Sequence, residues 1–146
     1  MIDSRTAPYA AALLRVSLGT MFIAHGLLKV FVFTLPGTAQ FFASVGFPGW
    51  TAYPVVAAEI AGGILLVLGV YSRAVAAALI PLLIGAASVH FGNGWVFSGA
   101  NGGWEYPVFL VVIAAVVALL GDGAYALKPA SFGGDARRIA HGPSLA

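Results

Sequence analysis

Long apolar runs separated by short polar segments dominate this chain. Four runs cover about residues 9–33, 54–71, 74–92 and 106–121. Each has about 16–25 residues, the length that a straight or tilted helix needs to cross a bilayer at a rise of 1.5 Å per residue. The pattern predicts an all-α fold, an integral membrane bundle of four transmembrane helices.

The connections between the runs differ in length. Only Ser72 and Arg73 separate the second run from the third, which predicts a tight antiparallel hairpin. Longer segments, LPGTAQFFASVGFPGW and NGWVFSGANGG, join the other runs, and both are rich in glycine and aromatic residues. Within the first of them, we interpret FFASVGFPGW as a short re-entrant or amphipathic piece at the membrane interface.

Composition strengthens the membrane interpretation. Of the 146 residues, 60% are hydrophobic and 8% are charged, whereas soluble domains have roughly 25% charged residues. Lipid is therefore an expected partner, and the length leaves no room for a soluble catalytic domain. We expect residues 1–127 to form one four-span membrane domain and residues 128–146 to form a flexible, basic cytoplasmic tail.

Two sequence patterns recur in the two halves of the chain. GWTAYPV, from residue 49, precedes the second run, and GWEYPV, from residue 103, precedes the fourth; HG at residue 25 is echoed by HFG at residue 90. Two repeated helical hairpins would explain both echoes. Chance recurrence is the alternative, because Trp and Tyr favour the interface and Pro suits the first turn of a helix.

Except for Lys29, which lies just inside the other end of the first run, the basic residues fall on one side of this topology, in the N-terminus, the tight turn and the tail: Arg5, Arg15, Arg73, Lys128, Arg137 and Arg138. Cytoplasmic loops are enriched in Lys and Arg, so both termini are predicted to be cytoplasmic. The tryptophans, Trp104 included, lie on the other side, as an interfacial aromatic belt would place them. The net charge of +2 gives no indication of nucleic acid binding.

Glu59 is the one formally charged residue in the second run. A carboxylate at that depth costs several kcal/mol unless it is paired or protonated, so it marks a candidate site. When the four helices are threaded in alternating directions, five titratable residues reach the outer half of the membrane. These are His25, Lys29, Glu59, His90 and Glu105.

The helical faces agree with this grouping. At about 100° per residue, His25 and Lys29 share a face of the first helix with Gly19, and Glu59 shares a face of the second with Gly63. Glycines allow helices to pack closely in membranes. The polar faces are therefore expected to point into the bundle, where Lys29 and Glu59 can form a buried ion pair.

This set of side chains suits a quinone head group, a proton relay or a polar metabolite. We predict no metal, because the ligands are scattered without His-x-x-x-His spacing and a nearby Lys disfavours a cation. Structural alternatives stay open. The ion pair of Glu59 could serve only to fix the helices, Lys29 and Glu105 could be interfacial anchors, and His90 could cap its helix. Arg15 and Arg73 receive supporting roles at the cytoplasmic side.

Four stretches resemble the DoxX family of small four-span bacterial membrane proteins: LLRVSLGTMFIAHGLLKV, FFASVGFPG, AAEIAGGILLVLGVYSRAVA and GGWEYPVFLVVIAAVVALLGDGAYAL. The resemblance covers roughly residues 12–127. It implies a four-helix bundle in the bacterial inner membrane, and it carries over His25, Lys29, Glu59, Arg73, His90 and Glu105 as polar motif positions. The family often ends in Ser-Leu-Asp where this chain has Ala126-Leu127-Lys128, so no acid is implied there.

Members of that family are linked to thiosulfate oxidation with quinone as acceptor and to membrane oxidoreductase assemblies. The chain has no cysteine, so it holds no thiol–disulfide chemistry or iron–sulfur cluster of its own. The resemblance implies a membrane subunit of an oxidoreductase system, without an intrinsic cofactor, whose polar pocket binds quinone or a small polar substrate beside partner subunits. A non-enzymatic scaffold subunit and a small-molecule or lipid transporter are the alternatives.

Overall fold

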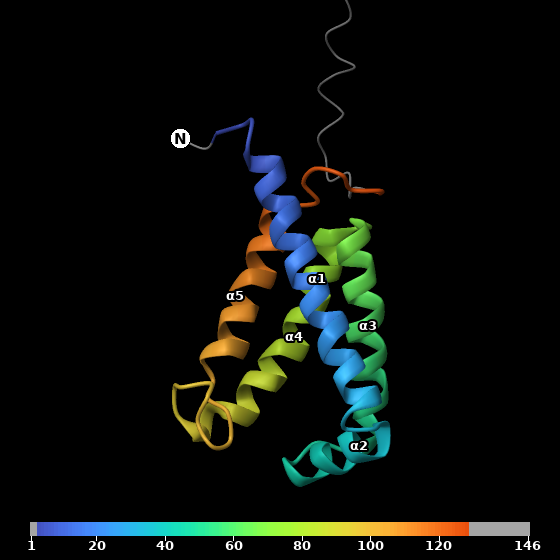
Figure 1. The fold of residues 1–146 in the computed structure, drawn as a ribbon, viewed down its shortest axis with the longest axis vertical. Coiled ribbons are helices and arrows are strands. Elements are labelled where there is room, and N and C mark those ends of the chain that lie inside the picture. Colours follow the sequence, from blue (N-terminus) through green and yellow to red (C-terminus); the bar gives the residue numbers. More distant parts are fainter. Residues whose placement is uncertain (1–2, 129–146) are drawn as a thin grey trace, which may run out of the picture.

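The computed structural model describes residues 3–128, which form five α-helices and no β-strand within that range (Figure 1). The helices are α1 (Ala7–Phe31), α2 (Leu35–Ser44), α3 (Ala52–Leu68), α4 (Ser72–His90) and α5 (Glu105–Leu120), with single 3-10 turns at Gly49–Thr51 and Phe91–Asn93. The all-α prediction is confirmed. Of the predicted tail, all but Lys128 lies outside the described residues.

Three helices are long and apolar enough to cross a bilayer. They are Ala7–Phe31, Gly49–Leu68 and Ser72–Asn93, with 25, 20 and 22 residues. The fourth, α5, is equally apolar in sequence but has 16 residues, or about 24 Å against a hydrocarbon core of about 30 Å. The fold is therefore that of a helical membrane protein, and a fourth crossing stays a prediction.

The long helices associate in two pairs. α1 packs mainly along α3, and α4 packs mainly along α5. Figure 1 shows the two pairs close together near the N-terminus and farther apart at the other end, where α2 lies under α1 and α3. Two repeated hairpins would pair in the same way, although the repeat itself stays a prediction.

Glycines set the close approach of α1 to α3. A Cβ atom added to Gly19 would lie 2.7 Å from the carbonyl oxygen of Gly63, and one added to Gly63 would lie 2.7 Å from the carbonyl oxygen of Gly19. Contact this close requires residues without a side chain. Beside this crossing, a buried apolar core joins all four long helices: Leu18, Phe22, Leu66, Ala76, Leu79, Leu83, Ala114 and Val117.

The turn between α3 and α4 comprises Gly69, Val70 and Tyr71, one helical turn earlier than the predicted break at Ser72 and Arg73. Gly69 adopts a φ of +69°, the left-handed conformation that commonly ends a helix. The carboxylate of Asp122 then accepts a hydrogen bond of 2.8 Å from the backbone N–H of Ser72. This bond satisfies one of the unpaired donors at the start of α4.

Arg15 stabilises the same end of the bundle. Its side chain is 1% exposed, and it donates hydrogen bonds of 2.8 Å to the carbonyl oxygens of Leu66 and Val67 and of 3.0 Å to that of Ala124. The last carbonyls of a helix have no partner within the helix. Arg15 thus caps α3, and Arg73 does the same for α5 through the carbonyl oxygen of Leu120.

Candidate functional site

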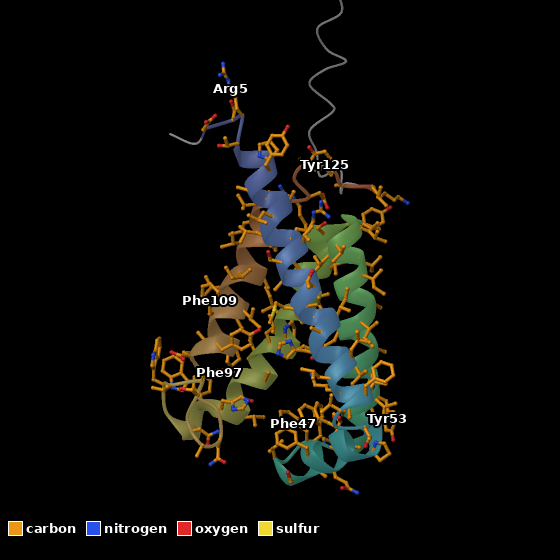
Figure 2. All side chains as sticks on the ribbon, viewed as in Figure 1. Arg5, Phe47, Tyr53, Phe97, Phe109 and Tyr125 are labelled. Atoms are coloured by element: carbon orange, nitrogen blue, oxygen red, sulfur yellow. The ribbon has the colours of Figure 1, made fainter. Side chains whose placement is uncertain are left out.

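A cavity of about 460 Å³ lies where the two helix pairs separate. This volume is in the range of small-molecule sites. Figure 2 labels two of its aromatic residues, Phe47 in the segment after α2 and Phe97 in the loop before α5. Most of the lining is apolar, and it includes Phe22, Phe41, Phe42, Phe47, Phe97 and Leu110. Such walls suit a flat, largely apolar ligand.

The ion pair expected between Lys29 and Glu59 is present at this cavity. Lys29 Nζ lies 2.5 Å from Glu59 Oε1, and both residues line the cavity. Gly26 allows the two helices to meet here, since a Cβ atom on it would lie 2.6 Å from Ile60. Within the described part of the chain, the second carboxylate oxygen, Oε2, is buried without a hydrogen-bond partner.

His25 connects α1 to α5. Its Nδ1 lies 2.8 Å from the carbonyl oxygen of Met21, one turn earlier on α1. Its ring stacks on that of Tyr106, with the ring centres 6.0 Å apart and the planes at 25°. The hydroxyl of Tyr106 is buried and has no hydrogen-bond partner among residues 3–128. Both rings line the cavity.

His90 lies at the end of α4 and holds the following loop. Its Nδ1 is 3.1 Å from the carbonyl oxygen of Gly102 and 3.2 Å from that of Asn101. The residue also lines the cavity. The position of His90 is therefore compatible with both predictions for it, a role in capping the end of its helix and a place in the pocket.

Glu105 does not line this cavity. Its Oε1 accepts a hydrogen bond of 2.8 Å from the backbone N–H of Phe97, and it borders a smaller hollow with Trp95 and Phe109. Trp104 packs edge-on against Trp95, with ring centres 4.6 Å apart. Both residues shape the loop that carries Phe97 into the cavity wall.

The supporting arginines lie elsewhere. Arg15 and Arg73 cap helix ends at the opposite end of the bundle, where the chain termini of the described part lie, and neither lines the cavity. Within residues 3–128, no three His, Asp or Glu side chains come together as metal ligands would. The cavity thus unites four of the five predicted pocket residues: His25, Lys29, Glu59 and His90.

Sequence reasoning missed Tyr106 and the phenylalanines of the segment around α2. The sequence interpretation uses Tyr106 only as part of the recurring GWEYPV pattern, and for Phe41 and Phe42 it favours lipid or core contacts over a ligand. One signal in the sequence could have identified the phenylalanines. Several aromatic residues follow directly after the polar end of the first helix, and a segment that only connected two helices would not require such large side chains there.

These features define a small helical membrane protein with one mostly apolar cavity whose polar groups come from α1, α3, α4 and α5. Residues 10–92 match the sequence model of the DoxX family. The chain is 36% identical over 123 residues to a Bacillus subtilis (strain 168) protein named "Putative oxidoreductase CatD", covering 84% of this chain and 87% of that protein. The chain belongs to the DoxX family. No solved structure matches it.

Proposed function

We propose that this protein is a membrane subunit of an oxidoreductase system and that its cavity binds a quinone-type ring. The observation that carries the proposal is the cavity itself, in which aromatic walls surround the Lys29–Glu59 pair, His25 and Tyr106. A quinone ring has apolar faces and polar atoms at its edge. The apolar walls of the cavity match the faces of the ring, and its polar side chains match the atoms at the edge. The name of the relative supports the same class of protein.

Partner proteins complete the proposed system. The chain has no cysteine, so it has no thiol to pass electrons to a second redox centre. The ligand would carry the electrons, and another membrane or membrane-associated subunit would exchange them with it. An assay of oxidoreductase activity in the purified protein, with and without such a subunit, tests whether the chain catalyses a step alone.

We also propose that the chain crosses the membrane of a bacterial cell four times, with both termini in the cytoplasm. The backbone N–H of Ala124 donates a hydrogen bond of 2.8 Å to the carbonyl oxygen of Pro8, so the chain after α5 lies beside the start of α1. The packing of α5 along α4 supports a fourth crossing at the same depth as that of α4. The basic residues Arg5, Arg73 and Lys128 belong to this end, which favours the cytoplasmic side and puts the cavity in the outer half.

Ligand titration tests the proposal. The purified protein in lipid nanodiscs is titrated calorimetrically, without oxygen, with a short-chain benzoquinone in each of its two redox forms. Saturable binding of at least one form is expected, weakened about tenfold or more by Glu59→Gln. Glu105→Gln is the matched control, because that carboxylate lies outside the cavity. Absence of saturable binding, or equal effects of the two variants, would contradict the proposal.

A scaffold subunit is the alternative that one observation favours. The Lys29–Glu59 pair joins α1 to α3, as a pair that only fixes helix register would do. Such a protein would bind no quinone and would copurify with a larger membrane complex in mild detergent. A transporter has less support, since the buried core of Leu18, Leu66 and Val117 fills the bundle beyond the cavity.

A further inference from the structure

The polar atoms that line the cavity are mostly hydrogen-bond acceptors. Glu59 is 8% exposed, and its Oε1 already forms an ion pair with the ammonium group of Lys29. Its Oε2 is buried and, within residues 3–128, has no partner. An ionised carboxylate can accept hydrogen bonds but cannot donate them. A ligand atom within hydrogen-bond distance of Oε2 must therefore carry a hydrogen.

The two histidines add further acceptors. In both His25 and His90, Nδ1 faces a backbone carbonyl oxygen, at 2.8 Å from Met21 and at 3.1 Å from Gly102. A carbonyl oxygen only accepts, so the hydrogen of the neutral ring is assigned to Nδ1. Nε2 is then left as an acceptor in each ring.

Two residues at the cavity can donate to a ligand. Lys29 has N–H groups beyond the one directed at Glu59, and the buried hydroxyl of Tyr106 can donate or accept. A ligand oxygen that both donates and accepts would satisfy Glu59 Oε2 and either of these donors. A ligand oxygen that only accepts would leave Oε2 unpaired and would gain no hydrogen bond there.

We propose that the cavity selects the reduced, hydroxyl-bearing form of a quinone-type ring over the oxidised form. The selection rests on the proposed function, which says only that such a ring binds. A hydroquinone O–H donates to Glu59 Oε2 while the oxygen accepts from Lys29 or Tyr106. A quinone carbonyl supplies no hydrogen, so sites built to receive a hydroxyl reject it. Binding alone is involved, and no electron transfer is required.

Three probes with the same ring and side chain separate the contributions: a short-chain hydroquinone, its dimethyl ether and the corresponding quinone. Each is titrated calorimetrically into the full chain in nanodiscs without oxygen. We expect the hydroquinone to bind about ten- to a hundredfold more tightly than the other two. The ether is the redox-inert control, because it keeps the ring and both oxygens and lacks the hydroxyl hydrogens.

Variants locate the acceptor. Glu59→Gln, whose amide can also donate, is expected to lower the preference for hydroquinone by about tenfold. Glu105→Gln should keep the preference, since the residue lies outside the cavity and the amide oxygen of glutamine can still accept the hydrogen bond from the backbone N–H of Phe97. If Glu59→Gln fails to fold, the neutral double variant Lys29→Gln/Glu59→Gln replaces it, and the three-probe comparison on the unaltered protein stands regardless.

The outcomes separate this inference from the proposed function. Equal affinities for the three probes, or tighter binding of the quinone, would overturn the selectivity and leave the ring-binding cavity in place. Equal binding of hydroquinone and dimethyl ether would show that the apolar walls alone hold the ligand, and would also overturn it. Absence of binding by all three probes would overturn both proposals.

Discussion

The Lys29–Glu59 pair has an energetic cost that determines how it can be tested. Glu59 is almost fully buried and Lys29 is partly exposed. Removing two charges from water is costly, and their attraction repays that cost only while both partners are present. Replacing one member of the pair should consequently lower the stability of the protein more than replacing both members together.

Lys29→Met should lower the free energy of unfolding by about 3–5 kcal/mol, because it leaves the carboxylate of Glu59 buried without its cation. The double variant Lys29→Met/Glu59→Met should recover most of that loss, since it leaves no unpaired charge. Thermal unfolding in detergent, followed by circular dichroism, measures both. Additive effects of the two single substitutions would show that the residues do not interact in the membrane protein.

At the same scale, the sequence could place Glu59 at the cavity, but it could not decide which of Glu105 and Tyr106 lines it. Both lie at the start of α5 and at the same depth. They differ by about 100° around the helix, so depth alone cannot say which one faces the cavity. That choice depends on the rotation of α5 against α4, which is set by packing of apolar residues that look alike in the sequence.

At the scale of helices, the crossing of α1 and α3 depends on Gly19 and Gly63. Gly63→Val should destabilise the protein by about 1–3 kcal/mol, the usual cost of overpacking. Its Cβ would lie 2.7 Å from the carbonyl oxygen of Gly19 and 2.8 Å from Ile23. The same thermal unfolding assay applies, and hydroquinone titration should report a weaker site because Lys29 and Glu59 move apart with their helices.

Gly85→Ala is the control for that substitution in the unfolding assay only, since Gly85 also lines the cavity. Gly85 lies within α4, and a Cβ atom there would meet nothing within 4 Å. Alanine also has the higher helix propensity. The control should therefore be neutral or slightly stabilising. A loss of stability in Gly85→Ala equal to that in Gly63→Val would mean that any change in a helix interior, and not the close crossing, causes the effect.

The sequence predicted the four long helices well and α2 poorly. Hydropathy places long helices, because a membrane-spanning run must be apolar throughout. The segment Leu35–Ser44 is short, and its signal is a local one. Thr34 accepts a hydrogen bond of 3.2 Å from the N–H of Gly37 at the helix start, and a proline follows in the first turn. Both are recognisable start signals.

At the scale of the whole molecule, the cavity arises because the helix pairs separate at one end (Figure 1). Sequence periodicity gives the face that each helix buries, but it does not give the angle between pairs. That angle follows from the sizes of residues in the shared core, such as Leu79 and Val117, and from the segment that fills the widened end. The sequence predicts a pocket around the polar residues, but it predicts neither the volume of the cavity nor its mostly apolar lining.

The absence of cysteine makes the proposed topology directly measurable. Single cysteines at Ser4, Ser98 and Lys128 would each be exposed on the protein surface. Ser4 precedes α1, Ser98 lies in the loop between α4 and α5, and Lys128 follows α5. A membrane-impermeant maleimide added to intact bacterial spheroplasts should label Ser98→Cys only. After permeabilisation it should label all three.

This pattern would establish four crossings with cytoplasmic ends. If the short helix α5 did not cross, Lys128→Cys would be labelled from outside together with Ser98→Cys. If the orientation were reversed, Ser4→Cys and Lys128→Cys would be labelled and Ser98→Cys would not, which would turn the cavity toward the cytoplasm. A partner that exchanges electrons with the proposed ligand would then have to be sought on the cytoplasmic side, because the cavity residues proposed to bind the ring lie at the end of the bundle that carries Ser98.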